Sequence, residues 1–201
     1  MVDKSRYPQI AERVEVSVDL PTLDYAQIQL QPVELNPIIH EIRSTPSCKL
    51  LIFGCGHDSR LWEEINPDGT TAFIEDNQDW ITLTRSQLKS SAVIKVDYDT
   101  RVIDWPLLID AGENLMLKLP ETITAHQWDV ILVDAPAGYD DVKPGRMKSI
   151  YTALRLVCAG GIIFVHDCER PLESAYCARY LGAERCIVSV KGRALLNGYR
   201  F

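Results

Sequence analysis

The chain lacks any apolar run long enough to cross a bilayer, and its first residues lack the apolar centre of a signal peptide. The longest apolar runs, residues 130–133 and 162–165, have only the length of β-strands. The sequence therefore predicts a cytoplasmic protein that does not bind membranes.

An excess of positive charge is also missing. The 201 residues carry a formal net charge of -7, and the lysines and arginines are scattered along the chain. A phosphate backbone would be repelled overall, so nucleic acid is not expected as a partner. The expected partner is a small-molecule or saccharide acceptor, and a homo-oligomer is left open.

The six cysteines form no Cys-x-x-Cys pair, and several stand in apolar segments. This pattern favours small, reduced core residues over a zinc site or a disulfide framework. No internal repeat and no low-complexity linker divides the chain, so one domain is predicted over residues 33–201. Residues 1–32 contain three prolines and no sustained period, and they predict an irregular arm or lid with a strand-like stretch at 14–18.

Short apolar stretches alternate with segments of helical periodicity. Strands are expected at 49–53, 70–74, 92–96, 128–133 and 162–165, and helices at 33–43, 61–65, 80–88, 145–158 and 172–181. Residues 186–190 and 194–201 then form a hairpin around a tight turn at 191–193. This order predicts an α/β fold with a doubly wound, mostly parallel sheet, to which the hairpin adds one antiparallel edge strand.

A glycine turn follows the first predicted strand directly. Gly54, Cys55 and Gly56 come after residues 49–53, and the polar His57, Asp58 and Ser59 can cap a following helix. Glycine is needed where the backbone turns sharply and approaches a ligand that a Cβ atom would obstruct. The turn therefore predicts a nucleotide-type cofactor.

Polar residues also gather where the other predicted strands end. They are Glu75, Asp76, Asp97, Asp134, His166 and Asp167. In an open α/β sheet the ligand binds outside the carboxyl ends of the strands, near the switch in strand order. We therefore expect these side chains and the glycine turn to line one cavity.

The glycine turn favours S-adenosylmethionine over a nicotinamide dinucleotide. A carboxylate at Glu75 can accept hydrogen bonds from the ribose of either cofactor, but the third glycine that a dinucleotide needs is missing near Arg60. S-adenosylmethionine has no phosphate and carries a sulfonium, so acidic neighbours suit it. The predicted cofactor-binding residues are Gly54, Cys55, Gly56, His57, Asp58, Ser59, Glu75, Asp76 and Asp97.

Longer motifs then resemble the plant glucuronoxylan 4-O-methyltransferase family, a polysaccharide-biosynthesis domain group. They comprise residues 51–59, Trp62, 66–71, 75–76, 128–129, 134–136, 138–139, 144–147, 150–151 and 166–167, in order and at compatible spacings. The resemblance covers about residues 33–201. Ala137 departs from the pattern, because members of the family tend to have lysine there, so the acceptor is expected to differ.

The resemblance implies a Rossmann-like class I fold and transfer of the methyl group of S-adenosylmethionine to a hydroxyl of a uronic acid or related sugar or small molecule. It also implies assistance by a divalent metal. In-line methyl transfer needs an aligned hydroxyl and a way to remove its proton. Asp134 and Asp167 are candidate ligands for Mg²⁺ or Mn²⁺, by analogy with catechol-type methyltransferases. His166 is either a general base or a hydrogen-bonded structural histidine.

Two residues are candidates for contact with the acceptor. Arg146 either clamps a substrate carboxylate or is an ordinary solvated arginine, and Tyr139 is placed in the acceptor pocket. The alternative function is a non-catalytic scaffold protein in polysaccharide biosynthesis that keeps the methyltransferase fold.

Overall fold

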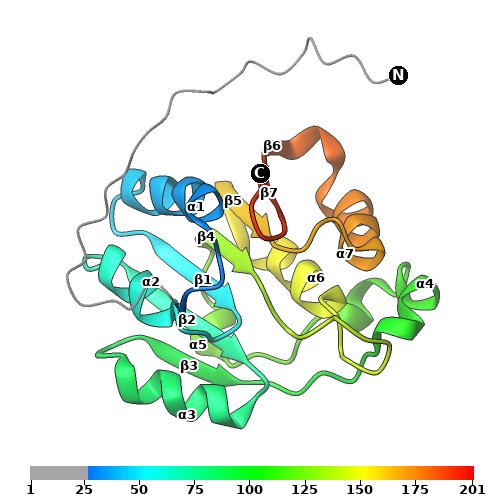
Figure 1. Cartoon of the computed structure of the whole chain (residues 1–201), viewed down its shortest axis with the longest axis horizontal. Helices are drawn as coiled ribbons and strands as arrows, with labels where there is room; N and C mark the ends of the chain where they lie inside the picture. The colour runs from blue at the N-terminus through cyan, green and yellow to red at the C-terminus, as the bar shows by residue number, and fades with distance from the viewer. Residues whose placement is uncertain (1–26) are drawn as a thin grey trace.

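The computed structural model of this chain describes residues 27–201. The strand-like stretch predicted at 14–18 lies outside the described residues, as does most of the predicted N-terminal arm. In the described part, one seven-stranded sheet has the order β3-β2-β1-β4-β5-β7-β6 (Figure 1). The strands are β1 (Lys49–Phe53), β2 (Thr70–Glu75), β3 (Ala92–Lys95), β4 (Trp128–Val133), β5 (Val157–Val165), β6 (Cys186–Lys191) and β7 (Leu195–Arg200).

The first five strands run parallel, as the sequence predicts, and β1 and β4 lie side by side at the centre. Their side chains are buried on both faces: Leu50 and Leu51 on β1 are both 0% exposed. Continuous apolar runs are what a parallel strand needs when helices cover both faces of the sheet. This is why short stretches without alternation formed strands here.

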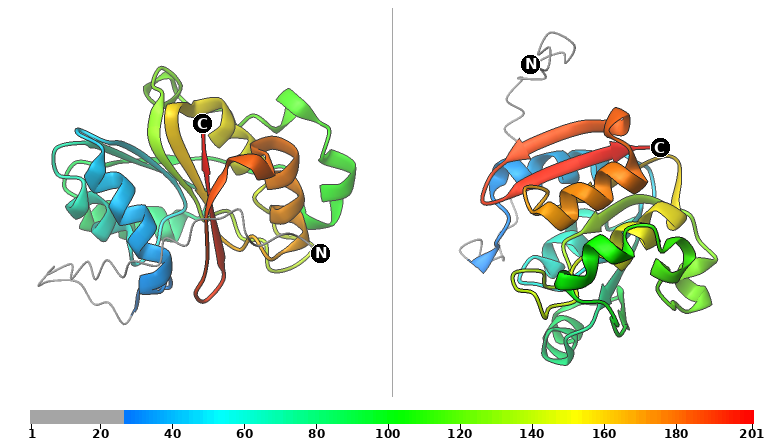
Figure 2. Two further views of the ribbon diagram at one scale, coloured as in Figure 1. Left: turned by 90° about the horizontal axis from the view of Figure 1, so that it is seen from above. Right: turned by 90° about the vertical axis from the view of Figure 1, so that its right-hand side faces the viewer.

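Helices cover both faces of the sheet (Figure 2). One face packs against α1 (Pro32–Ser44), α2 (Ser59–Ile65) and α3 (Gln78–Gln87). The other packs against α6 (Met147–Leu156) and α7 (Pro171–Tyr176). Short helical pieces between β3 and β4 complete this second layer: η3 (Val102–Asp104), α4 (Trp105–Leu108), η4 (Gly112–Leu115) and α5 (Glu121–Thr124). The predicted doubly wound architecture is confirmed.

The C-terminal hairpin forms as predicted, but its antiparallel strand is not at the edge. β7 lies between β5 and β6 and runs antiparallel to both, so the edge strand β6 points the same way as β5. At Gly198 of β7 an added Cβ atom would come within 2.8 Å of the Phe164 ring on β5, so only glycine admits this close approach.

Two elements differ from their predicted bounds by more than two residues. β5 begins at Val157 and includes Gly160 and Gly161, whereas the sequence predicts that the preceding helix continues to 158 and that the strand begins at 162. The helix predicted over 172–181 divides into α7 and the π-helical turn η5 (Cys177–Leu181), and the short helix η6 (Ala183–Arg185) follows it. Among residues 27–201, no helix combines the length and the apolar character needed to span a bilayer.

Candidate active site

The glycine turn lies where the central strands β1 and β4 end. Gly54 has a φ of 121°, and a Cβ atom there would come within 3.0 Å of the Cβ of Ala135 in the loop after β4. Backbone bonds hold the two loops in place, since Gly54 N donates to Ile74 O at 2.8 Å and Asp134 N donates to Phe53 O at 2.9 Å. A side chain at Gly54 would therefore be both strained and obstructed.

Glu75, at the end of β2, holds the glycine turn from the other side. Its Oε2 accepts a hydrogen bond from Cys55 N at 2.7 Å, and its Oε1 accepts from Asp76 N at 2.9 Å and from Asn77 N at 2.7 Å. The side chain is 4% exposed, and burial raises the pKa of Glu75 despite these bonds. The structure thus assigns Glu75 first to fixing the backbone around the predicted cofactor.

The remaining residues of the turn have different environments. Asp58 Oδ2 accepts from Trp62 Nε1 at 2.9 Å, and burial together with the charge of Asp134 raises the pKa of Asp58 to about 6. Ser59 Oγ accepts from Gly56 N at 2.9 Å. His57 is exposed and packs edge-on against Trp80, with ring centroids 5.1 Å apart.

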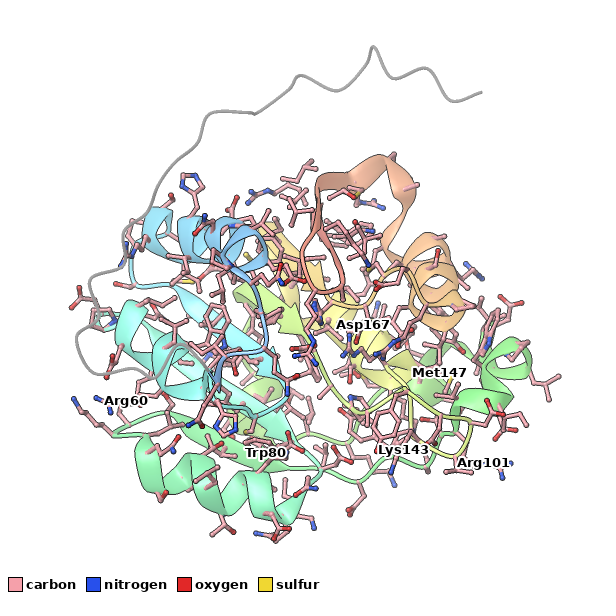
Figure 3. The ribbon with its side chains drawn as sticks, viewed as in Figure 1. Arg60, Trp80, Arg101, Lys143, Met147 and Asp167 are labelled. Atoms are coloured by element: carbon pink, nitrogen blue, oxygen red, sulfur yellow. The ribbon has the colours of Figure 1, made fainter. Side chains whose placement is uncertain are left out.

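A single cavity of about 990 Å³ opens at this edge of the sheet. Of the predicted site residues it is lined by Gly54, Cys55, Gly56, Asp58, Glu75, Asp76, Asp134, Tyr139, Arg146, His166 and Asp167. His57, Ser59 and the exposed Asp97 are not in its lining. Figure 3 labels three of the lining residues: Trp80 in the first turn of α3, Lys143 in the loop after β4, and Asp167 just after β5.

Arg146, just before α6, is buried at the floor of this cavity. Its Nη2 donates to Asp134 Oδ1 at 2.9 Å and lies 2.7 Å from Asp167 Oδ2, and it also bonds the backbone oxygen of Asp134 at 2.8 Å. Its Nη1 donates to the backbone oxygen of His166. The residue is 4% exposed. Arg146 is thus neither solvated nor free to clamp a substrate, because it fixes the two carboxylates in place.

His166 lies between two carboxylates. Its Nδ1 is 2.9 Å from Asp134 Oδ1, and its Nε2 is 2.9 Å from Glu34 Oε1. Burial alone would favour the neutral ring, but the hydrogen bonds and charges of Asp134 and then Glu34 raise the pKa of His166 to about 9. At neutral pH the ring is an imidazolium with both N–H groups donating. This geometry favours the structural alternative for His166 over the general base.

Glu34 is a site residue that sequence reasoning missed. It lies in the first turn of α1 and is 0% exposed. Besides His166, it accepts hydrogen bonds from the backbone N–H groups of Gln31, Arg193 and Ala194, at 2.7, 3.2 and 3.1 Å. The available signal was a charged residue on the apolar face of the helix, one turn before Ile38, where a buried carboxylate requires partners.

Three carboxylates of this cluster pair with three cations, and the buried carboxyl of Glu173, whose pKa burial raises, interacts with the charges of Arg146 and Arg170. The carboxylates of Glu34, Asp134 and Asp167 face the cations Arg146, His166 and Arg170, whose Nη1 lies 3.0 Å from Asp167 Oδ2. Asp134, His166 and Asp167 also present ligand atoms within 4.8 Å of one another, as a metal site would. Any cation bound there would join a cluster that is already neutralised.

Other lining residues went unpredicted. Gln29 and Leu30, within the predicted arm, reach the cavity, as do Lys143 and Arg193. Tyr139 is 71% exposed, and Lys143 Nζ lies 5.2 Å from the centre of its ring.

Comparison with known proteins gives a consistent result. The profile of a family described as IRX15/IRX15L/GXM matches residues 33–118 and 113–197. Curated relatives from Arabidopsis thaliana include glucuronoxylan 4-O-methyltransferase 3, which is 37% identical over 67% of this chain and 52% of its own length. Glucuronoxylan 4-O-methyltransferase 2 is 32% identical over 87% of this chain and 69% of its own length. Arabinogalactan O-methyltransferase 2 is 28% identical over 80% of this chain and 63% of its own length. The chain spans about half the length of the first of these relatives.

Solved structures with the same fold are methyltransferases. A Staphylococcus aureus protein provisionally assigned as a caffeoyl-CoA O-methyltransferase matches with a TM-score of 0.56 at 14% identity, over 88% of this chain and 87% of that one. A precorrin-6y C5,15-methyltransferase from Geobacter metallireducens matches with a TM-score of 0.50 at 12% identity, over 88% and 95%. At such low identity the likeness concerns the fold alone, and it confirms the predicted class I methyltransferase architecture.

Proposed function

The chain belongs to the IRX15/IRX15L/GXM family, and from this premise we propose that it is an S-adenosylmethionine-dependent O-methyltransferase acting on a glucuronic acid residue of a saccharide. The observation that carries the proposal is the shared cavity, where the glycine turn and the polar ends of β1, β2, β4 and β5 converge. The names of the curated relatives support the reaction and the saccharide class of the acceptor.

The glycine side of the cavity fits the cofactor. Gly54 leaves a backbone cradle that a Cβ atom would fill, and the carboxylates of Asp58 and Asp76 line the cavity beside it. When bound, S-adenosylmethionine supplies an electrophilic methyl group on a positively charged sulfur. Asp58 and Asp76 favour that charge, and Glu75 keeps the turn in its binding conformation. Exclusion of a side chain at Gly54 lets the ligand approach the backbone.

The opposite side of the cavity is where the acceptor hydroxyl would be aligned. Asp134 is the carboxylate at the end of the central strand β4, with its side chain 29% exposed. Its Oδ1 is held by Arg146 and His166, while no described residue bonds its Oδ2. We assign Asp134 Oδ2 to orienting the acceptor hydroxyl and receiving its hydrogen bond. Arg146 and His166 lower the pKa of the half-buried Asp134 carboxyl, so Asp134 is a weak base before the reaction. As the hydroxyl oxygen gains the methyl group, its O–H bond breaks and Asp134 Oδ2 accepts the proton, which it then releases to solvent.

The residues fit a divalent cation in part. Within residues 27–201, Asp134 Oδ2 and Asp167 Oδ1 have no hydrogen-bond partner, and such oxygens are preferred by Mg²⁺ and Mn²⁺. His166 is not available as a ligand, since both ring nitrogens are engaged. A cation held by Asp134 and Asp167 would acidify a bound hydroxyl. Because Arg146 already neutralises these carboxylates, the affinity should be weak, which a Mn²⁺ titration of the wild type and Asp134→Asn will measure.

Calorimetry with S-adenosylhomocysteine tests the cofactor assignment. Glu75→Gln removes the negative charge to which three backbone N–H groups donate. A hydrogen bond to a charged group is worth about 1.5–3 kcal/mol, so the affinity for S-adenosylhomocysteine should fall about 10- to 150-fold. The matched control is Glu121→Gln on the exposed surface of α5. Unchanged affinity in Glu75→Gln would contradict the assignment.

Turnover tests the reaction itself. Transfer of labelled methyl groups should be measured on glucuronate-bearing xylan and arabinogalactan oligosaccharides, with and without a chelator. The non-catalytic scaffold is kept as a second candidate, because two further relatives, at 33% and 32% identity, carry the names Protein IRX15-LIKE and Protein IRREGULAR XYLEM 15, which state no activity. Binding of the cofactor product without turnover on any uronate would select that second candidate.

A further inference from the structure

Charge is unevenly distributed around the cavity once internal ion pairs are set aside. On the glycine side, Asp58 and Asp76 bring acidic groups from the loops after β1 and β2. The basic lining residues come from the other loops: Lys143 follows β4, Arg170 follows β5, and Arg193 stands between β6 and β7. One half of the cavity therefore suits a cation, and the other suits an anion.

Only some of the basic residues have charge to offer a ligand. Arg146 is held by Asp134 and Asp167, and Arg170 by Asp167. By contrast, the guanidinium of Arg193 forms no ion pair or hydrogen bond with any residue in 27–201. The ammonium group of Lys143 lies over the Tyr139 ring and forms no ion pair in that range, while the backbone N–H of Lys143 donates to Asp140 Oδ1 at 3.1 Å. Glu169, an acidic residue of the lining, is already paired with Lys191 at 2.7 Å.

The turn that carries Arg193 is fixed relative to the centre of the site. The backbone N–H groups of Arg193 and Ala194 donate to Glu34, whose Oε1 also accepts from His166. Gly192 makes this possible, since a Cβ atom there would come within 2.4 Å of Glu34 Oε2. The backbone position of Arg193 is therefore set by the same buried carboxylate that orients His166.

We propose that Arg193 binds the carboxylate of the acceptor, with Lys143 adding positive charge to the same half of the cavity, and that this pair selects an anionic sugar over a neutral one. The proposal rests on the proposed function. A guanidinium can hold a carboxylate through two parallel hydrogen bonds, which fixes the orientation of the sugar ring as well as its affinity. Arg146, which the sequence offered for this role, is already engaged by Asp134 and Asp167.

Kinetics with two acceptors tests the assignment. The acceptors are a glucuronate-bearing xylo-oligosaccharide and the same compound with its carboxyl reduced to an alcohol. Arg193→Ala should raise the KM for the uronate about 10- to 100-fold, with a much smaller effect on kcat and on the reduced acceptor. Arg193→Lys should recover part of the loss, and Lys143→Met should show a smaller increase in KM. Arg43→Ala, an exposed arginine outside the cavity lining, is the matched control.

Affinity for S-adenosylhomocysteine, measured on each variant, shows whether the fold and the cofactor half remain intact. An unchanged KM for the uronate in Arg193→Ala, or an equal loss with both acceptors, would overturn the role of Arg193 while leaving the proposed function standing. A wild-type protein that binds S-adenosylhomocysteine but methylates no uronate would overturn the proposed function, and this proposal with it.

Discussion

Raising the pH should destabilise this protein through His166. The ring is 9% exposed and donates to Asp134 and Glu34, which raises its pKa from 6.5 to about 9 in the folded state. A group whose pKa is higher in the folded state binds its proton more tightly there. Its stabilisation is therefore complete below pH 6.5 and is lost as the pH rises toward 9.

The size of the effect follows from this shift. Between 6.5 and about 9 the difference is about 2.5 pKa units, and at about 1.4 kcal/mol per unit it corresponds to about 3 to 4 kcal/mol. Because the ring is buried, solvent screening reduces this stabilisation free energy only slightly. The loss is a large fraction of the about 5–15 kcal/mol that stabilises a typical domain.

Urea denaturation between pH 6 and 10, with a chelator present, measures the effect. His166→Gln should lose most of the pH dependence, and His40→Gln, on the exposed side of α1, should retain it. Proton NMR of the His166 ring in the wild type gives the pKa directly, even if a variant folds poorly. A ring that titrates near pH 6.5, or a wild-type curve that is flat from pH 6.5 to 9, would refute the imidazolium and restore His166 as a candidate base.

Three further predictions concern the neighbouring residues. Gly54→Ala should abolish binding of S-adenosylhomocysteine. Its control is Gly160→Ala, which is also at positive φ but has no atom within 4 Å of the added Cβ. This control should only lower the free energy of unfolding, by about 1–3 kcal/mol. Arg146→Lys should lower the free energy of unfolding in urea by about 3–5 kcal/mol, because it breaks the ion pairs with Asp134 and Asp167. Arg170→Lys, whose side chain is 33% exposed, should lower it by about 1 kcal/mol or less. Binding of S-adenosylmethionine in calorimetry should weaken as the pH falls through about 6, where Asp58 becomes protonated, and Asp58→Asn should remove that dependence.

The parallel strands were predictable because their burial is a local property of the sequence. Residues 128–133 formed β4 with the predicted bounds, and 49–53 formed β1. The insertion of β7 between β5 and β6 was not predictable in the same way. Both hairpin strands have compatible patterns, and the close approach of Gly198 to Phe164 in the observed order joins residues distant in sequence.

The site residues also divide into those that the order of elements along the chain predicts and those that depend on contacts between distant elements. Chain order alone placed Gly54, Asp134 and Asp167 at one edge of the sheet, because parallel strands end there. Glu34, which accepts from Nε2 of His166, could not be found from the order of strands, since it lies 132 residues earlier on α1. Asp97 also follows a strand, yet β3 is the edge of the sheet, and the residue lies exposed outside the cavity lining.

The buried ionic cluster explains how this site can be rigid before any ligand binds. Glu34 links α1 to the turn at Arg193, His166 links Glu34 to Asp134, and Arg146 links Asp134 to Asp167. Four segments far apart in sequence are thus tied together at the cavity floor by paired charges. A methyl transfer depends chiefly on alignment, since a misplacement of about 1 Å can cost about a hundredfold in rate. A cluster in which Arg146 and His166 hold Asp134 through Oδ1 is suited to that role, because the carboxylate that receives the acceptor hydroxyl then stays in place while the reaction proceeds.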